Sequence, residues 1–180
     1  ILMVPLMIET LAKKMEDTKD LPKKLVKNMI FGKQFHTICS GGAYLNPDYI
    51  DLFAQYGITI LQGYGMTECS PVISTNLSWD IRKNSVGKLM PNCTAKVVDE
   101  ELWVKGSSVM QGYYKMPEET AEALVDGWLR TGDLGYVDQD GYIYLTGRRK
   151  NLIITKNGEN VSPEELENRP QPPVKLLVSM

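Results

Sequence analysis

The chain has 180 residues, of which 43% are hydrophobic, enough apolar material for one folded core or two small ones. Its formal net charge of −2 argues against a nucleic-acid-binding surface, which normally carries an excess of basic residues. The three cysteines, Cys39, Cys69 and Cys93, contain no CxxC pair, and the single histidine, His36, does not easily complete a zinc site with them.

The sequence shows no sign of a membrane-spanning segment. No apolar run approaches the roughly 18 residues that such a helix needs. The opening ILMVPLMIETL is apolar, but it has no basic leader, so it does not resemble a signal peptide. We therefore expect a cytoplasmic protein with reduced thiols. Because the first residue is not methionine, we also expect the chain to be part of something longer.

The first third of the chain predicts alternating helices and strands. Apolar residues at helical spacing favour amphipathic helices at 6–17 and 23–31. A strand is expected at 35–39, a helix from Asn46 to Gly57 and a second strand, short, apolar and β-branched, at 58–61. A strand–helix–strand unit of this kind has parallel strands and a right-handed crossover.

Two glycine-rich segments follow these strands, SGGA at 40–43 and GYGMTE at 63–68. Because the carboxyl ends of parallel strands meet at one edge of a sheet, we expect the two segments to form one crevice suited to a nucleotide. The Tyr64 ring suits stacking on a base, the Thr67 hydroxyl suits a phosphate, and Glu68 is an oxygen ligand suited to Mg²⁺. A simple tight turn is the alternative for such a glycine pair.

The pattern of predicted secondary structure changes after Pro71. Short strand-like runs recur about every ten residues, separated by glycine and proline, and predict a small antiparallel sheet or barrel. The expected strands are 72–75, 94–98, 102–105, 109–113 and 142–145, with one helical insert at 117–125. The turn at 138–141 joins its flanking strands as a hairpin. The VDEEL junction at 98–102 is abrupt, as if residues were missing there.

Two polar features of the second half of the chain suit nucleotide binding, but each also has a simpler structural interpretation. Asp133 is expected on a loop, where its carboxylate can accept hydrogen bonds from ribose hydroxyls; an aspartate in a glycine turn is the alternative. The basic run 148–150 suits anions, although solvation alone explains it. Further on we expect a strand at 152–155, a helix beginning at Ser162 and a last strand at 174–178.

Four segments stand in one order: SGGA, GYGMTE, WLRTGD and GRRKNLIITKNGENVSPEELE, with LWVKGSSVMQGYY between the second and third. Together they resemble the adenylate-forming superfamily of acyl-CoA synthetases, amino-acid adenylation domains and luciferases, over residues 5–167. The resemblance implies that a carboxylate attacks the α-phosphate of ATP to give an acyl adenylate and pyrophosphate. A thiol, usually coenzyme A, then takes the acyl group.

The resemblance also implies a set of nucleotide-binding residues: Gly41, Gly42, Ala43, Gly63, Tyr64, Gly65, Met66, Thr67, Asp133, Arg148 and Gly158. The 41–43 loop is expected along the adenine and Tyr64 stacked on it. Asp133 is expected to hold both ribose hydroxyls, and Arg148 also to reach the ribose.

The same resemblance gives catalytic roles to Thr67, Glu68 and Lys150. Thr67 contacts the α-phosphate, Glu68 is the Mg²⁺ ligand, and Lys150 is the hinge about which a small C-terminal domain swings. Gly158 lies near the pantetheine tunnel in the thioester-forming state. No side-chain nucleophile is required, so we place His36 and Cys39 in the strand core.

The expected fold is α/β, with a partial parallel βαβ subdomain at 1–75 and a small antiparallel β-barrel-like subdomain at 76–146. Residues 147–180 are the hinge and the beginning of a C-terminal α+β domain. The family's lysine-bearing phosphate loop and its second catalytic lysine have no counterpart here. We therefore expect a fragment that does not turn over by itself and binds nucleotide weakly.

The leading interpretation is a fragment of an AMP-forming acyl-CoA synthetase that uses a carboxylic acid, ATP, Mg²⁺ and coenzyme A. A fatty acid is favoured because KNGENVSPEELE looks most like the long-chain ligases, and such a substrate would bring the enzyme to a membrane surface. An amino-acid adenylation domain and a non-catalytic nucleotide-binding module are the alternatives. Neither the acyl substrate nor the oligomeric state can be read from the sequence.

Overall fold

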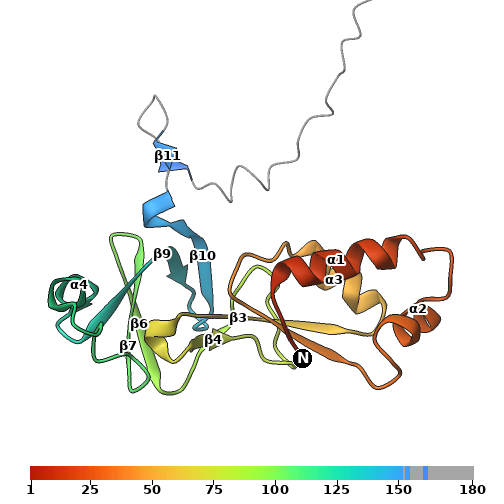
Figure 1. The fold of residues 1–180 in the computed structure, drawn as a ribbon, viewed down its shortest axis with the longest axis horizontal. Helices are drawn as coiled ribbons and strands as arrows, with labels where there is room; N and C mark the ends of the chain where they lie inside the picture. Colours follow the sequence, from red (N-terminus) through yellow and green to blue (C-terminus); the bar gives the residue numbers. More distant parts are fainter. Residues whose placement is uncertain (152, 155–159, 162–180) are drawn as a thin grey trace, which may run out of the picture.

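The computed structural model describes residues 1–151, 153, 154, 160 and 161, and these form two lobes side by side (Figure 1). The first lobe is a mixed five-stranded sheet with the order β1-β2-β3-β4-β5. Its strands are β1 (Leu2–Met3), β2 (Thr37–Ser40), β3 (Thr59–Gly65), β4 (Val72–Thr75) and β5 (Lys88–Leu89). Strands β1, β2 and β3 run parallel, whereas β4 and β5 are antiparallel to their neighbours. The predicted parallel βαβ unit is confirmed.

The helices of this lobe are α1 (Pro5–Glu16), α2 (Lys23–Ile30) and α3 (Asp48–Gln55). Figure 1 shows α1 and α3 on the same side of the first sheet. Their apolar faces meet alternate residues of β2 and β3, so that Ile8, Phe53 and Ile60 are fully buried. The Asn46 side chain accepts a hydrogen bond from the Asp48 amide at 2.9 Å, which satisfies one free N–H at the start of α3.

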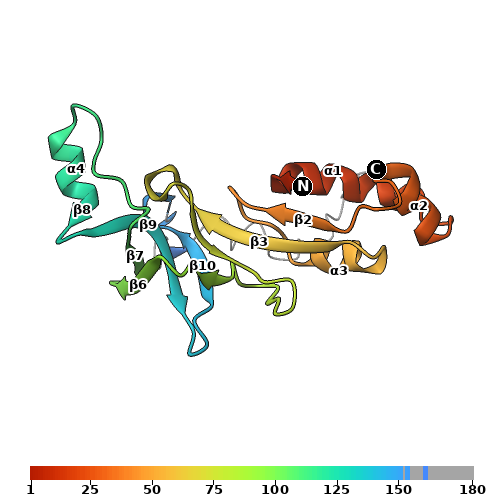
Figure 2. The same ribbon diagram turned by 90° about the horizontal axis from the view of Figure 1, so that it is seen from below.

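The opposite face of the parallel strands is open, and the view from below looks onto it (Figure 2). Because residues alternate along β2, Ile38 and Ser40 point to the buried face and Cys39 to the open one. The prediction that His36 and Cys39 lie in the core is therefore wrong: both are exposed. Leu2 of β1 is likewise 79% exposed.

Strand β3 is longer than its apolar core predicts, because residues 62–65 continue it instead of forming a turn. They pair with β4 in an antiparallel ladder that shifts register between Tyr64 and Gly65. A Cβ on Gly65 would lie 2.0 Å from the Pro71 carbonyl oxygen. This glycine is thus required for the close return of the chain into β4. The tight turn itself is the short 3₁₀ helix η1 (Thr67–Cys69).

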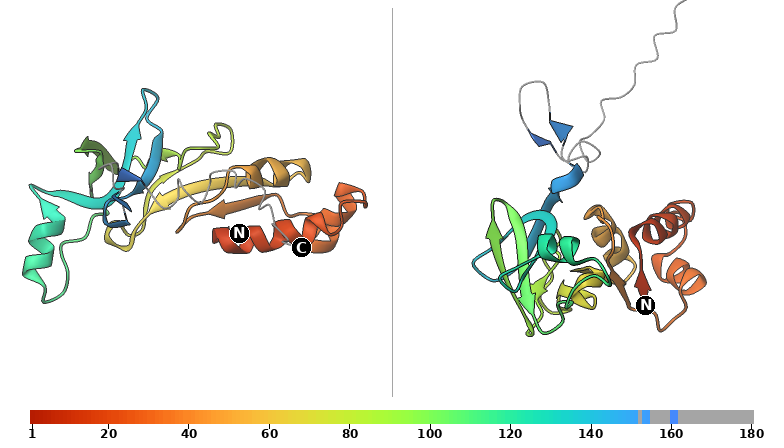
Figure 3. Two further views of the ribbon diagram at one scale, coloured as in Figure 1. Left: turned by 90° about the horizontal axis from the view of Figure 1, so that it is seen from above. Right: turned by 60° about the vertical axis from the view of Figure 1, so that its left-hand side comes forward.

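The second lobe is an antiparallel sheet with the order β10-β9-β7-β6, and β8 pairs with β9. It confirms the predicted β-rich second half. Its elements are β6 (Cys93–Val98), β7 (Glu101–Gly106), α4 (Pro117–Ala123), β8 (Leu124–Val125), β9 (Trp128–Val137) and β10 (Ile143–Arg148). The α4 helix lies at the end of the molecule remote from α1 and α2 (Figure 3). The β9–β10 hairpin is confirmed, with Val137 opposite Ile143.

Three details of this sheet differ from the sequence prediction or complete it. Only the last two residues of the ten-residue strand β9, 136–137, were predicted, and β9 carries Asp133 within a strand instead of a loop. No strand forms at 109–113. The VDEEL junction is a two-residue hairpin turn in which Asp99 and Glu100 both have positive φ, 50° and 64°.

Beyond β10 the chain continues into η2 (Arg149–Asn151), and β11 (Ile153–Ile154) pairs antiparallel with β12 (Asn160–Val161). The helix predicted from Ser162 and the strand predicted at 174–178 lie outside the described residues. Among the helices that the structure describes, none is long and apolar enough to span a membrane.

Residues 76–87 form a loop that connects β4 to β5 of the first sheet and contacts β10 of the second. The Val86 amide donates to the Ile143 carbonyl and the Ile143 amide to the Gly87 carbonyl, both at 3.0 Å. The buried side chain of Ser85 donates to the Ile143 carbonyl at 2.7 Å, and the buried Asn76 amide donates to the Ser85 carbonyl at 2.8 Å. These polar groups are buried but paired, so their contacts fix one arrangement of the two lobes.

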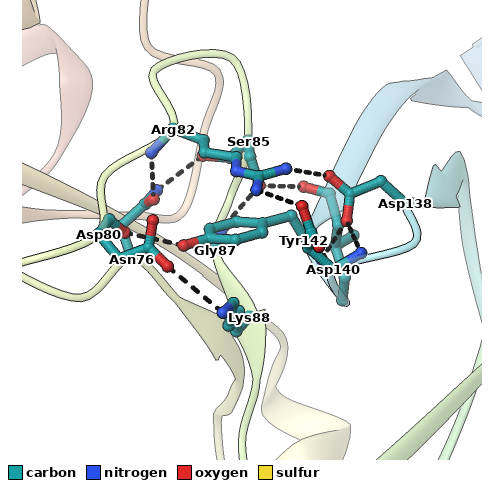
Figure 4. Close-up of polar contacts among 10 residues, drawn as sticks. Asn76, Asp80, Arg82, Ser85, Gly87, Lys88, Asp138, Asp140 and Tyr142 are labelled. Carbon is teal, nitrogen blue, oxygen red and sulfur yellow. Dashed lines mark hydrogen bonds and ion pairs between the residues drawn. The ribbon is translucent and has the colours of Figure 1, made fainter.

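A cluster of charged residues holds the outer side of the same loop against the β9–β10 hairpin (Figure 4). The Arg82 guanidinium lies 4.1 Å from the centroid of the buried Tyr142 ring and pairs with Asp138 at 2.6 Å and Asp140 at 2.5 Å. The Tyr142 hydroxyl donates to the Asp80 carbonyl at 3.0 Å, and burial raises the pKa of Tyr142 to about 12.

We predict that Gly65→Ala destabilises the fold by about 3 kcal/mol, because the new methyl group overlaps the backbone of Pro71 and the β4 strand must move. Gly141→Ala is the control, since its φ is 83° but open space surrounds it. That change carries only the cost of the left-handed conformation, about 1 kcal/mol. Urea unfolding of both variants measures the difference, and equal losses would contradict the close return into β4.

The Arg82 cluster predicts an acid-sensitive fold. Burial opposes ionisation of Asp138, but the amides of Tyr142 and Asp140 and the Arg82 charge hold its pKa below the ordinary 3.8. Its contribution to stability is complete above that value and is lost as the pH falls through the lower, folded-state pKa. We expect Asp138→Asn to lower the thermal midpoint at neutral pH and to flatten its fall in acid. Asp99→Asn, in the exposed β6–β7 turn, should leave the acid slope unchanged.

Candidate nucleotide-binding site

A cleft of about 730 Å³ lies between the two lobes. The loop after β2 and the end of β3 form one wall, β9 and β10 form the opposite wall, and the 76–87 loop closes one side. A space of this size is typical of small-molecule sites. The described residues that line it are Ser40, Gly42, Ala43, Tyr44, Leu45, Pro47, Gln62, Gly63, Tyr64, Gly65, Lys83, Asn84, Val86, Asp133, Leu145, Thr146, Gly147 and Arg148.

The first wall brings together the two glycine-rich segments, as expected from the parallel strands. Gly42 and Ala43 from the β2–α3 loop line the cleft with Gly63 of β3. A Cβ on Gly41 would lie 3.2 Å from the Gly63 carbonyl, so a glycine there lets the loop lie directly against β3. Gly42 has a φ of 86°, a conformation that glycine adopts without strain.

The second wall presents the Asp133 carboxylate, which is only 5% exposed. Its Oδ1 atom accepts a hydrogen bond from the Arg148 Nε at 2.7 Å, across the β9–β10 pair. Hydrogen bonding to Asp133 raises the pKa of Arg148, so this guanidinium stays charged. The second oxygen of Asp133 points to the other wall.

Tyr64 and Asp133 meet across the cleft although they are 69 residues apart in the chain. The Tyr64 hydroxyl donates to the Asp133 Oδ2 at 2.6 Å. Burial of the phenol, together with the neighbouring carboxylate charge, raises the pKa of Tyr64 far above its ordinary value. The phenol therefore remains a hydrogen-bond donor, and it fixes the carboxylate beside the edge of its own ring.

The 76–87 loop supplies a side of the cleft that the sequence did not predict. Gln62 of β3 donates from Nε2 to the Lys83 carbonyl at 2.5 Å, and the Lys83 ammonium forms an ion pair with Asp51 of α3. These contacts hold Lys83 and Asn84 at the cleft. No local pattern marks this pair; the only signal in the sequence is the polar loop between two strands.

Residues 1–114 match the family model described as "AMP-binding enzyme". The chain belongs to this family. The structure of this AMP-binding chain is similar to that of O-succinylbenzoate coenzyme A synthetase from Bacillus subtilis in complex with ATP and magnesium ion. The TM-score is 0.73 with 30% sequence identity, over 93% of this chain and 35% of that one.

Two curated relatives give the same family. Over 131 residues the chain is 40% identical to long-chain-fatty-acid–CoA ligase FadD15 of Mycobacterium bovis, covering 72% of this chain and 22% of the relative. Over 151 residues it is 42% identical to 4-coumarate–CoA ligase-like 4 of Oryza sativa subsp. japonica, covering 74% of this chain and 27% of the relative. The AMP-binding chain thus spans about a quarter of the length of these relatives.

The predicted phosphate and metal residues of this AMP-binding chain follow the end of β3 but do not line the described cleft. Thr67 is exposed at the start of η1, and Glu68 is half-buried. The Glu68 Oε1 accepts a hydrogen bond from the Tyr113 hydroxyl at 2.8 Å. In the part of the chain that the structure describes, no three His, Cys, Asp or Glu side chains gather as a metal site. A single carboxylate suits Mg²⁺, which is usually held by one or two carboxylates together with substrate phosphates.

The remaining predicted residues are more peripheral. Gly41 and Met66 flank the cleft without lining its described part. Lys150 is exposed in η2. It lies two residues after Arg148, the arginine that pairs with Asp133. Gly158 lies outside the described residues.

Proposed function

We propose that the cleft binds the adenosine part of ATP and of an acyl adenylate. The observation that carries this proposal is the contact of Tyr64 with Asp133 at 2.6 Å in a cleft between two glycine-rich backbone segments. An aromatic ring beside a carboxylate offers a stacking surface for a base next to an acceptor for ribose hydroxyls. The glycines keep side chains out of the space between them.

The residue roles of this proposal follow from their places around the cleft. Gly42, Ala43 and the Tyr64 ring take the adenine. Asp133 accepts hydrogen bonds from the ribose hydroxyls, and Arg148, paired with it at 2.7 Å, lies at the same end. The phosphates would then run toward Thr67 and Glu68, beyond the end of β3. A structural neighbour that was solved in complex with ATP and magnesium ion supports ATP and Mg²⁺ as ligands.

We further propose that the parent protein is an AMP-forming acyl-CoA synthetase in which Glu68 helps to hold Mg²⁺. The metal would neutralise charge on the phosphates during attack by the substrate carboxylate. This chain's own contribution is to orient the nucleotide so that its α-phosphate lies in line with the acid. The relative described as a long-chain-fatty-acid–CoA ligase supports a fatty acid as substrate and coenzyme A as acceptor.

Lys150 and the domain boundaries belong to the same proposal. Residues 1–75 and 76–146 are two subdomains, and residues 147–180 contain the hinge, at Lys150, and the beginning of a C-terminal domain. The exposed position of Lys150, just after the last strand of the second sheet, supports this role. We also propose a cytoplasmic location, which the three unpaired cysteines support.

Calorimetric titration of the 180-residue chain with ATP and Mg²⁺ tests the site. We expect weak but measurable binding that falls at least about tenfold in Tyr64→Ala and in Asp133→Ala, since each removes a direct contact to the nucleoside. Tyr114→Ala is the matched control, because that tyrosine is 85% exposed and lies outside the cleft. Unchanged affinity in both cleft variants would contradict the proposed function.

A further inference from the structure

Glu101 is a buried carboxylate at the start of β7, outside the nucleotide cleft. It is only 2% exposed. A carboxylate so deeply buried is tolerated only when charged or polar partners satisfy it. Three partners surround it: the Gly132 amide donates to Oε1 at 2.9 Å, and the guanidinium groups of Arg149 and Arg130 approach Oε2 at 2.8 and 3.4 Å. Two of these partners adjoin residues of the proposed site in the chain: Gly132 precedes Asp133, and Arg149 follows Arg148.

The first link runs through an irregularity in β9. The β7–β9 ladder pairs Trp103 with Arg130, but its next pair is Glu101 with Leu134, so β9 contains extra residues between them. Gly132 at the centre of this bulge has a φ of 73°. Bulges re-aim side chains and interrupt pairing. Here the bulge turns Asp133 to the cleft, and the Glu101 carboxylate accepts the Gly132 amide that the bulge leaves without a ladder partner.

The second link runs through two consecutive arginines. Arg148 binds Asp133 at 2.7 Å, and Arg149 binds Glu101 at 2.8 Å. Two buried acids on neighbouring strands thus hold the two arginines that end β10 and begin η2. Burial opposes ionisation of Glu101, but hydrogen bonds from the Gly132 amide and Arg149, together with the Arg130 charge, outweigh it and hold the pKa of Glu101 below the ordinary value. The carboxylate is therefore charged at neutral pH, as both contacts require.

We propose that Glu101 is a positioning residue for the nucleoside: it fixes Asp133 through the Gly132 amide and fixes Arg148 through Arg149. This rests on the proposed function, in which Asp133 receives the ribose. Glu101 itself does not touch the nucleotide. Its loss should therefore weaken recognition of the ribose hydroxyls more than the binding of the base.

The test compares Glu101→Gln, which preserves shape but removes the charge, with Glu100→Gln in the adjacent exposed turn. ATP and 2′-deoxyATP are titrated into each variant and into the unmodified chain. We expect the unmodified chain and Glu100→Gln to prefer ATP. In Glu101→Gln, ATP affinity should fall about tenfold and the preference over 2′-deoxyATP should shrink toward that of Asp133→Ala. Simple destabilisation lowers both affinities equally, so an unchanged preference would overturn the proposal.

Hydrogen exchange keeps the proposal testable without a nucleotide. We expect the Gly132 and Asp133 amides to exchange faster in Glu101→Ala, which removes the acceptor, and not in Glu100→Ala; unchanged protection would overturn the role of Glu101. If the unmodified chain binds no ATP, the proposed function fails, and this exchange result alone decides whether Glu101 holds the bulge. If Glu101→Gln does not fold, Arg149→Gln, at a partly exposed position, should reproduce the loss of ribose preference and Arg149→Lys should partly restore it.

Discussion

The hydrogen bond from Tyr64 to Asp133 is the contact on which the arrangement of this molecule depends. It joins β3 of the first sheet to β9 of the second, across 69 residues of sequence, and both side chains are buried. A buried carboxylate without this donor and the Arg148 guanidinium would face a large desolvation cost. The contact therefore links the two lobes inside the cleft, which lies around it.

Paired polar groups act together with apolar packing to hold the lobes in this relation. One apolar cluster lies within the first lobe, whereas the second spans the lobes and joins Ile73 of the first sheet to Leu129 of the second. The 76–87 loop also contacts both sheets and is held by Asn76 and Ser85 inside and by Arg82 outside. Hydrogen-bonded networks of this kind specify one geometry, because a displaced partner leaves a buried group unsatisfied. Such specificity suits a site whose two walls belong to different sheets.

Local patterns were sufficient to predict the parallel unit of the first lobe. The apolar run at 58–61 and the helix after Asn46 define it, and the glycine segments then had to meet at one sheet edge. The same reasoning missed most of β9, because two glycines and an aspartate interrupt its strand pattern around the bulge. It also misplaced Cys39, since a strand covered on one face only exposes every second residue.

Residues brought to the site by long-range contacts could not be predicted in this way. Lys83 reaches the cleft through the Gln62 side chain and an ion pair with Asp51, and nothing near it in sequence indicates either partner. Glu101 is similar: it follows a two-residue turn, where a solvated carboxylate is the ordinary expectation, yet it is 2% exposed. Sequence patterns indicate which residue types suit a nucleotide, whereas tertiary structure decides which side chains support them.

A double-mutant cycle of Tyr64→Phe and Asp133→Ala, measured by the free energy of unfolding, tests the contact between the lobes most directly. Tyr64→Phe removes the donor and Asp133→Ala removes the acceptor, so the coupling between them isolates the hydrogen bond. We predict a coupling free energy of about 1.5 to 3 kcal/mol, as for a buried hydrogen bond to a charged group. A coupling near zero would contradict the account, because the two strands would then not be joined at this point.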